Sequence, residues 1–552
     1  MRYSQRKWKS WIVISACVAM GVGCGDDNPA QVSVKVYGAE HVAGAEFSQG
    51  MPEMNEATSV VVRVTDPASG EVLGSESTTM DSGGMKMPEV SGGSDRRLEV
   101  ALYDEGGEPV GAGNTPVFSG GDTAFRQFRT LVGPVEDFSR IGAVFSLAGG
   151  QESVNASVFD DSSLDMEGVG RVGHRMAETS TGQIVVVGGA RLGSQAGSTE
   201  MPEIVEVYND IQLFDPATGH FTELGGQYSV DSELIGHDRM EEGRAFHSVT
   251  PLGEDRFLVA GGFGLSGEST RPRGSLEVID LNASPGNRVQ PLGANLDERR
   301  GHHTATYRPG DGKVVIAGGL GTGNEDIRDT IEVVDPRAGE VESGIPMVDG
   351  RVGHGAVLLE DEQTVWLTGG RSDGGTLSST ELVAPGAGGT ESEAGFSMDR
   401  PREAHGALAL GAENNQQVLL VGGYDNGSAI DGYEMGTPLR SSEPFVQGGW
   451  QLERARGEMQ VVRMEQSGDI LVFGGSAEGD IKQSAERYRL DLNNIQSPLQ
   501  SIDRSMGEMR FGRLGAEAIV ANNGHVLVAG GQDGSGGARN DAEYFIGYDP
   551  VH

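Results

Sequence analysis

The sequence predicts an all-β protein in which a small immunoglobulin-like β-sandwich precedes a seven-bladed β-propeller. Three observations carry this prediction. Seven short apolar runs end in a Gly-Gly pair, an Arg-x-x-His element or its remnant stands before each pair, and the first part of the chain alternates polar and apolar residues between Gly, Pro and Asp turns. The 552 residues are enough to form the cores of two domains.

The Gly-Gly pairs set the period of the repeat. Successive pairs lie 73, 57, 51, 53, 52 and 56 residues apart, so a unit of about 50 residues recurs with loop insertions. This period is typical of propeller blades. The pairs begin at Gly188, Gly261, Gly318, Gly369, Gly422, Gly474 and Gly530.

The residues before each Gly-Gly pair predict a β-hairpin. In the third unit, Gly310-Asp311-Gly312 separates the apolar segments Thr304 to Tyr307 and Val314 to Ala317. A third β-rich run follows the variable loop after each pair, as in TIEVVDP of the same unit, and often ends in a turn signal. Each unit therefore predicts at least three consecutive strands.

The Arg-x-x-His element ends about 14 to 17 residues before the Gly-Gly pair. Its histidines are His174, His247, His302, His354 and His405. A residue that recurs in five blades is more often a hydrogen-bonding group between blades than a ligand contact, so we expect a structural role for these histidines. In units six and seven the aligned stretches are ARGE and RFGR, which places Glu458 and Arg513 at the histidine position. We expect this pair to form a salt bridge, with a recognition site as the alternative.

These units resemble kelch repeats, because the Arg-x-x-His, Val-Val-Gly-Gly and Tyr/Phe-Asp-Pro landmarks recur in this order over roughly residues 150–552. The resemblance implies a propeller of four-stranded blades, the type of propeller also found in galactose oxidase. The aromatic residue that usually follows the third strand is present as Phe221 and Trp450 but is missing from most units. The last unit stops after its third strand, so we expect Val154 to Asp160 to supply the fourth strand and close the ring.

Residues 1–23 predict a signal peptide. Four cations precede the apolar run from Trp11 to Gly23, which is too short to span a bilayer. The Gly23-Cys24 junction resembles a bacterial lipoprotein signal, which implies a lipid on Cys24 followed by a short linker over residues 24–30. Cys17 is the alternative, because Ile14-Ser15-Ala16-Cys17 fits the lipobox letters better, although its use would shorten the apolar segment. Gly25 in place of Asp implies the outer membrane, on its periplasmic side or at the cell surface.

Residues 31–140 predict the β-sandwich, which we expect to serve as a stalk. The alternating runs are QVSVKVY, SVVVRVT, RLEVALY, TPVFS and AFRQFRT, separated by Gly, Pro and Asp turns. Met80, Met85 and Met87 cluster between the second and third runs. Thioethers bind Cu(I), but methionines in a Gly/Ser loop are also common without a metal, so we predict no cofactor.

The charge of the chain excludes two kinds of partner. The formal net charge of −39 becomes −43 when the four signal cations are removed, which repels nucleic-acid phosphates and anionic lipid head groups. Contact with a membrane is therefore predicted only through the lipid anchor. The two cysteines, Cys17 and Cys24, lie in or at the signal, so no disulfide is expected in the folded domains.

One face of the propeller is the candidate ligand surface. In an antiparallel hairpin the start of the first strand lies beside the end of the second, so the Arg-x-x-His elements and the loops after the Gly-Gly pairs emerge together. We predict a non-catalytic cell-envelope lipoprotein that binds a protein or carbohydrate on this face, and a purely structural envelope protein is an alternative. The candidate ligand-face residues are Arg191, Arg271, Arg273, Arg328, Arg371, Tyr424, Glu458, Arg513 and Arg539.

An enzyme is the second alternative. The galactose-oxidase type needs a Cys cross-linked to a Tyr beside copper, and no Cys follows Cys24. Sugar mutarotases on the same fold need only a few polar side chains, so Glu458 with Arg513 is the pair that would move a proton. The chain has no nucleophile elbow, HExxH, phosphate loop or paired-carboxylate motif, and we therefore predict that it is not an enzyme.

Replacement of Cys24 by Ser should release the protein from membranes into the soluble fraction, because the lipid then has no sulfur to which it can attach. Cys17→Ser is the matched control and should leave the protein in the detergent-extracted membrane fraction. Fractionation followed by immunoblotting measures both variants. Release of Cys17→Ser together with retention of Cys24→Ser would move the anchor to Cys17.

Overall fold

The computed structural model contains only β-strands as regular elements in the part of the chain that it describes, which confirms the all-β class. Within the same part, no helix is long and apolar enough to cross a membrane. The described residues are 12–18, 30–38, 58–65, 72–79, 97–107, 109–114, 126–132, 138–141, 144–148, 151–155, 170–195, 197–216, 220–224, 238–410, 417–438, 445–464, 468–491, 499–501, 509, 511–521, 524–539 and 542–545.

The N-terminal region contains two sheets. β3 (Ser59–Thr65), β4 (Val72–Thr79), β5 (Arg97–Tyr103) and β6 (Pro109–Asn114) form an antiparallel sheet in the order β4-β3-β5-β6. Alternate valines of β3, Val60, Val62 and Val64, are buried, as the period of two in a strand requires. β1 (Ile12–Val18) pairs with β2 (Ala30–Gly38), and β2 pairs in parallel with β7 (Arg126–Val132).

The predicted strands of this region agree in part with the observed ones. The runs at 31–37, 59–65, 97–103 and 124–130 overlap β2, β3, β5 and β7, whereas β4 and β6 are additional strands. The run TPVFS, residues 115–119, lies outside the described residues. The immunoglobulin-like arrangement of residues 31–140 stays a prediction. The methionine cluster at residues 80–87 lies outside the described residues.

The rest of the described chain is built around seven blades of four strands each, and neighbouring strands within a blade are antiparallel. Blades two to seven are separate four-stranded sheets, whereas blade one is part of a six-stranded sheet. The bounds of their strands are as follows: blade one β11 (Arg175–Glu178), β12 (Ile184–Val187), β15 (Ile211–Asp215) and β16 (His220–Glu223); blade two β17 (Ser248–Gly253), β18 (Arg256–Ala260), β21 (Ser275–Asp280) and β22 (Val289–Asn295); blade three β23 (Thr304–Arg308), β24 (Lys313–Ala317), β25 (Thr330–Asp335) and β26 (Glu340–Pro346); blade four β27 (Gly355–Leu358), β28 (Val365–Thr368), β31 (Thr380–Gly386) and β32 (Gly389–Ala394); blade five β33 (Gly406–Ala409), β34 (Val418–Val421), β37 (Gly432–Gly436) and β38 (Phe445–Gln451); blade six β39 (Gln460–Arg463), β40 (Ile470–Phe473), β43 (Ala485–Leu490) and β44 (Leu499–Ser501); blade seven β45 (Glu517–Val520), β46 (Val526–Ala529), β47 (Ala542–Phe545) and β8 (Phe138–Ile141).

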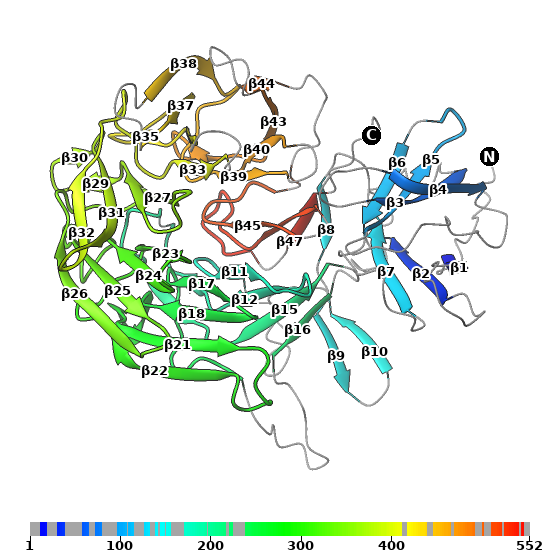
Figure 1. Ribbon diagram of the computed structural model, residues 1–552, viewed down its shortest axis with the longest axis horizontal. Helices are drawn as coiled ribbons and strands as arrows, with labels where there is room; N and C mark the ends of the chain where they lie inside the picture. Colours follow the sequence, from blue (N-terminus) through cyan, green and yellow to red (C-terminus); the bar gives the residue numbers. More distant parts are fainter. Residues whose placement is uncertain are drawn as a thin grey trace.

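The blades form a closed ring (Figure 1). The first strand of each blade contacts the first strand of the next, and β45 of blade seven contacts β11 of blade one. These seven first strands are the inner strands of a propeller. The ring therefore has no gap between its last and first blades.

The strand that completes blade seven is β8, which lies beside β47 (Figure 1). The expected donor, Val154 to Asp160, is wrong: Val154 and Asn155 belong to β10 (Gln151–Asn155), which pairs with β9 (Val144–Ala148), and residues 156–160 lie outside the described residues. β9 meets β16 of blade one through a single parallel pair. β8 thus forms the outer edge of blade seven, and β9 lies at the outer edge of blade one. The sequence did not predict this arrangement, because these strands are short and lack a clear alternation of polar and apolar residues.

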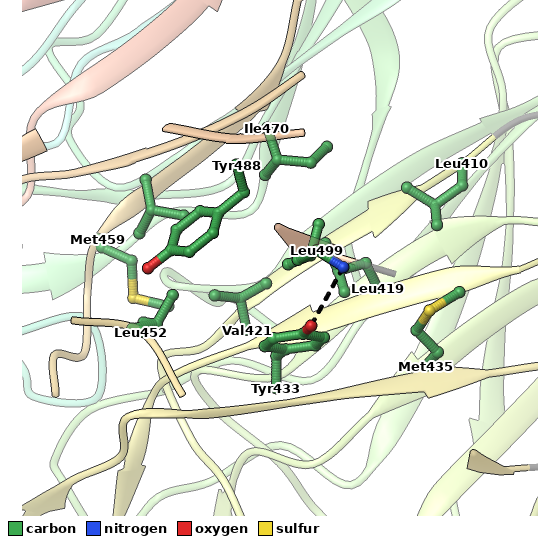
Figure 2. Packing of buried hydrophobic residues seen from close by; sticks show 11 residues of the cluster. Leu410, Leu419, Val421, Tyr433, Met435, Leu452, Met459, Ile470, Tyr488 and Leu499 are labelled. Atoms are coloured by element: carbon green, nitrogen blue, oxygen red, sulfur yellow. Dashed lines mark hydrogen bonds between the residues drawn. The ribbon is translucent and has the colours of Figure 1, made fainter. Parts of the chain in front are cut away.

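Apolar side chains fill the spaces between adjacent blades. The second strand of each blade is buried along its apolar run, as in Val418–Val421 and Ile470–Phe473. Figure 2 shows the cluster between blades five and six, where Tyr433 and Tyr488 pack among aliphatic and methionine side chains. The hydroxyl of Tyr433 accepts a hydrogen bond from the backbone N–H of Leu499 at 3.2 Å. Burial of each such side chain contributes roughly 1.5 to 3 kcal/mol, so the blades associate through their faces.

Each Gly-Gly pair lies where two blades meet. The first glycine of every pair has a φ between 56° and 65°, and a Cβ on it would come within 2.3 to 3.1 Å of the backbone carbonyl oxygen of an arginine in the next blade. The N–H of the second glycine donates to the same carbonyl, for example from Gly189 to Arg244 and from Gly531 to Arg171. Only glycine fits both the left-handed conformation and the close approach, which explains the repeat.

The arginine in question, here called the ring arginine, is buried in every blade. Its guanidinium donates to the carbonyl oxygen of the first glycine of its own blade, at 2.7 to 3.2 Å, and is paired with a carboxylate on the third strand or, in blade one, with Asp210 directly before that strand. The pairs are Arg171–Asp210, Arg244–Glu277, Arg300–Glu332, Arg351–Glu381, Arg402–Glu434, Arg456–Glu486 and Arg513–Glu543. A buried charge without its partner typically costs 3 to 5 kcal/mol, so these pairs hold each blade to a fixed geometry.

Proline at position 140 should destabilise the ring, because Arg140 lies opposite Glu543 in the β8–β47 ladder and proline has no N–H to donate. We expect the melting temperature of Arg140→Pro to fall by several degrees, the effect of losing about one or two hydrogen bonds. Val154→Pro, in the strand that was expected to close blade seven, is the matched control and should have the smaller effect. Differential scanning calorimetry measures both, and a larger loss in Val154→Pro would contradict the assignment of β8.

Candidate functional site

In five blades the loop after the Gly-Gly pair forms a small hairpin at one end of the ring. These hairpins are β13 (Ala190–Leu192) with β14 (Ile204–Val207), β19 (Phe263–Ser266) with β20 (Ser269–Pro272), β29 (Arg371–Ser372) with β30 (Gly375–Thr376), β35 (Tyr424–Asp425) with β36 (Ser428–Ala429), and β41 (Ser476–Ala477) with β42 (Asp480–Ile481). In every blade, the residue after the ring arginine bridges to the residue after the Gly-Gly pair, as in Val172↔Ala190. The Arg-x-x-His elements and these hairpins therefore share one face.

Most of the predicted ligand-face arginines are engaged with neighbouring groups. Arg191 pairs with Glu206 at 3.2 Å, and both side chains are largely exposed. Arg273 pairs with Glu242, and Arg328 pairs with Asp326, at 3.1 and 3.0 Å. Arg539 lies over the ring of Phe511, with its guanidinium carbon 3.7 Å from the ring centroid, whereas Arg271 is exposed. Exposed pairs of this kind contribute little stability and leave the face locally neutral or acidic.

Arg513 is not part of this surface. It is the ring arginine of blade seven, fully buried against Glu543 at 2.8 Å. The expected Glu458–Arg513 pair is therefore wrong, because the two residues do not occupy equivalent positions. Glu458 stands two residues after the ring arginine Arg456, and the positions equivalent to the repeat histidines are held by Met459 and Ala516.

The same register correction applies to the third unit. Its ring arginine is Arg300, so its repeat histidine is His303 and not His302. The doubled RR and HH in this unit hid the true register from sequence alignment. His302 instead lies against the rings of Phe246 and Phe263, at 4.4 and 5.6 Å between centroids.

Three repeat histidines bond to a hydroxyl of the preceding blade. The Nε2 atoms of His303, His354 and His405 lie 3.0, 2.9 and 2.9 Å from the hydroxyls of Ser248, Thr304 and Thr368. The repeat histidines are buried, and burial lowers the pKa of each, to about 3 in His174 and His405. They are thus neutral at physiological pH and act between blades.

An inner rim lies where the seven inner strands begin. We define it as the two residues after each ring arginine and the residue after each Gly-Gly pair. The second residue after the ring arginine has a φ between 50° and 67° in all seven blades, although four of these residues are not glycine. The four are Phe246, His302, Ala404 and Glu458. Side chains held in this conformation are uncommon and mark positions where the sequence departs from the structural optimum.

The inner rim has two chemically different halves. On blades one to four the rim is apolar, and Val172, Phe246, Phe263, Leu320 and Val352 pack in one buried cluster. On blades four to seven it is polar, and these polar residues, here called the polar arc, are Arg371, Glu403, Tyr424, Glu458, Ser476 and Gln532. Arg371, Tyr424 and Glu458 were predicted from the sequence as ligand-face residues, whereas Glu403, Ser476 and Gln532 were not. The sequence signal for these three is their position directly after a ring arginine or a Gly-Gly pair.

Hydrogen bonds join several members of the polar arc. The Tyr424 hydroxyl donates to the Ser476 carbonyl oxygen at 3.0 Å, and a Cβ on Gly457 would collide with the Tyr424 ring. Arg371 lies 3.6 Å from Glu403. Burial raises the pKa of Glu403, which Arg371 opposes, and burial also raises the pKa of Glu458. The arc thus brings two carboxyl groups, a guanidinium, a phenol and an amide to one half of the rim.

A long loop from blade one reaches the opposite side of the rim. This crossing loop, residues 193–203 of which residue 196 lies outside the described residues, joins β13 to β14. The hairpins of blades four, five and six turn through residues 373–374, 426–427 and 478–479. Its Ser198 N–H donates to Glu458 Oε1 at 2.5 Å, and its Thr199 carbonyl accepts from Arg371 Nη2 at 2.6 Å. The sequence signal for this loop is the spacing of 73 residues after the first Gly-Gly pair.

Deeper along the inner strands, Arg175 of β11 pairs with Glu517 of β45 at 2.8 Å. Burial raises the pKa of Glu517, and Arg175 lowers it. This pair joins blades one and seven next to the closure of the ring. Among the residues that the structure describes, no group of three or more His, Cys, Asp and Glu side chains is placed to hold a metal ion.

No protein-family model and no curated protein matches the chain. Among solved structures, the chain is similar to YjhT, with 12% identity and a TM-score of 0.42 over 61% of this chain and 98% of that one. It is also similar to a novel fungal alcohol oxidase of the AA5 family in complex with copper, with 16% identity and a TM-score of 0.46 over 69% of this chain and 76% of that one. The propeller architecture rests on the sheet topology and the closed ring of inner strands.

His405→Met should make the protein less sensitive to acid. The pKa of His405 is about 3 in the folded protein and near 6.5 in the unfolded chain, so the unfolded chain binds a proton that the folded one rejects, and stability falls as the pH drops from about 6.5 towards 3. Blade six has methionine, Met459, at the equivalent position. Methionine has no group that binds this proton in the unfolded chain. The loss in melting temperature between pH 7 and pH 5 should therefore be smaller in the variant than in the wild type.

Thr368→Val is the matched control, because it removes the hydrogen-bond partner of His405 but keeps the imidazole. Its melting temperature should fall at all pH values, with the pH dependence of the wild type. An unchanged pH dependence in His405→Met would contradict the lowered pKa.

Proposed function

We propose that the protein is a non-catalytic binding scaffold of the cell envelope, anchored by a lipid on Cys24, which binds a protein or carbohydrate through the face that bears the post-Gly-Gly hairpins. One observation carries the proposal: the inner rim departs from the repeat while the buried frame beneath it does not. The ring arginine, a carboxylate partner and the Gly-Gly pair recur in all seven blades, although blade one supplies the carboxylate from Asp210 and has Gln212 where the other blades have Glu. The rim residues above them differ from blade to blade.

The division of the rim supports recognition over a purely structural role. A side chain needed only for ring stability is free to repeat, as the ring arginine does. The polar arc instead places Glu403, Ser476 and Gln532, which are at least nine-tenths buried, beside Arg371 and Tyr424. Polar groups held in a largely desolvated position beside an apolar surface are typical of ligand sites, because they fix the orientation of what binds there.

The catalytic alternative loses its candidate pair. Arg513 is buried against Glu543, and Glu458 binds the crossing loop, so the two do not form an acid–base couple. The anchor is proposed from the sequence alone. Cleavage before Cys24 would remove β1 and leave β2 paired with β7.

Binding by the polar arc predicts that Glu403→Gln captures the partner about tenfold more weakly than the wild type, since one charged hydrogen-bonding group is lost. The chain from residue 25 onward, immobilised, is incubated with cell-envelope extract and with a glycan array, and bound material is quantified. Arg256→Met, at the opposite end of blade two, is the matched control and should bind like the wild type.

Both variants should unfold at the wild-type temperature to within a few degrees. Equal capture by wild type and Glu403→Gln would remove the polar arc from the proposal. If neither screen yields a ligand that the wild type captures better than Glu403→Gln does, the purely structural alternative is favoured.

A further inference from the structure

The crossing loop makes its contacts with the opposite blades through its main chain. Asn324 Oδ1 of blade three accepts from the Met201 N–H at 2.6 Å, and Gln532 Nε2 of blade seven donates to the Ser194 carbonyl at 3.3 Å. The contacts of Arg371 and Glu458 are likewise with backbone atoms, of Thr199 and Ser198. Side chains from four blades therefore bind the peptide groups of one loop, whose ends are joined by the Gly193 N–H and the Glu203 carbonyl at 2.8 Å and whose tip turns between Gly197 and Glu200.

These side chains are departures from the repeat. Arg371 and Gln532 directly follow their Gly-Gly pairs, where blades one to three carry Ala190, Phe263 and Leu320. Glu458 occupies a rim position with positive φ, where blade five has Ala404. The least regular part of the rim is thus the part that recognises the loop.

The fit at the centre of the loop is close. A Cβ on Gly197 would lie 2.6 Å from Glu458 Oε1, and a Cβ on Gly353 of blade four would lie 2.5 Å from Thr199 Cγ2. Only small residues fit between blades four and six. Two positions further on, Met201 packs against the apolar half of the rim. The rim therefore binds a main chain with small residues, followed by an apolar side chain.

We propose that the inner rim is a binding site for a peptide loop of this kind, a site that the crossing loop occupies within the same chain. The proposal rests on the proposed binding function and names its ligand class: a segment of a partner protein with Gly, Ser or Thr at the polar arc and an apolar residue two or three positions later. Such a segment competes with the crossing loop for the same four side chains. Binding of the partner requires that the loop leave the rim, which lowers the affinity that the open rim would have.

The site is tested with the crossing loop supplied as a separate molecule. A variant of the full chain replaces residues 193–203 by the Asn-Gly turn of blade five. The probe is a fluorescent synthetic peptide, GSQAGSTEMPE, the sequence of residues 193–203. Fluorescence anisotropy should show binding to the shortened variant, and binding to the wild type at least about tenfold weaker, because the wild-type rim is already occupied.

Point substitutions in the shortened variant test the residues. Glu458→Ala, which copies blade five, and Arg371→Met should each weaken peptide binding about tenfold, the effect expected for loss of a charged hydrogen-bond partner. Arg256→Met, far from the rim, and a peptide of the same composition in scrambled order are the controls. A folded shortened variant that does not bind the peptide, or binds the scrambled peptide equally well, overturns the proposal.

A second variant covers the case in which the shortened chain does not fold. Ser198→Pro keeps the loop length but removes the N–H that donates a hydrogen bond to Glu458. The loop should then hold the rim less tightly, so this variant should bind the added peptide more tightly than the wild type does. Equal binding by Ser198→Pro and wild type would overturn the proposal.

Failure of this inference is distinguishable from failure of the proposed function. If an external ligand is captured equally by wild type and the shortened variant, and the peptide does not compete with it, the binding function stands and the occupied site does not. If the peptide binds as expected but neither screen yields a ligand, the occupied site stands and the proposed function does not.

Discussion

The fold depends on a contact that recurs seven times, in which the ring arginine joins its own blade to the preceding one. Its guanidinium is held by a third-strand carboxylate and by the carbonyl of the first glycine in the same blade, while its backbone carbonyl accepts the N–H of the second glycine of the blade before. The guanidinium bonds within the blade and the backbone bond to the preceding blade hold the same residue in place, because a buried guanidinium needs its partners. The last of these bonds, from Gly531 to Arg171, closes the ring.

The repeat histidines depend on that frame. The ring arginine stands three positions before each of them in the sequence. A Cβ on the first glycine of the preceding blade would lie within 2.6 to 3.2 Å of the imidazole. The histidines are therefore buried, and they are neutral at neutral pH. Methionine and alanine replace them in blades six and seven, and both are buried, so the position is apolar and buried even where it carries no imidazole.

The frame also explains why the rim is free to vary. The arginine, carboxylate and glycines recur in the blades, whereas the rim positions carry different side chains from blade to blade. The rim accordingly carries a phenol, a guanidinium and carboxyl groups on one half and an apolar cluster on the other. The crossing loop contacts both halves through backbone groups and through Met201, and it is the only part of blade one that extends to blades three, four, six and seven among the residues described.

The sequence by itself determined the all-β class, the period of the blades and the face on which the variable loops emerge. These follow from local rules: glycines with positive φ at a close approach, apolar runs of strand length, and the antiparallel hairpin that brings its two ends together. Tertiary structure decided the register of Arg300 and Arg513, because the doubled Arg and His residues leave the alignment ambiguous until the carboxylate partner is known. It also decided that β8, and not Val154 to Asp160, completes blade seven. Closure and the meeting of Ser198 with Glu458 join residues hundreds of positions apart, and such contacts depend on the whole ring being formed, a condition that no local pattern in the sequence encodes.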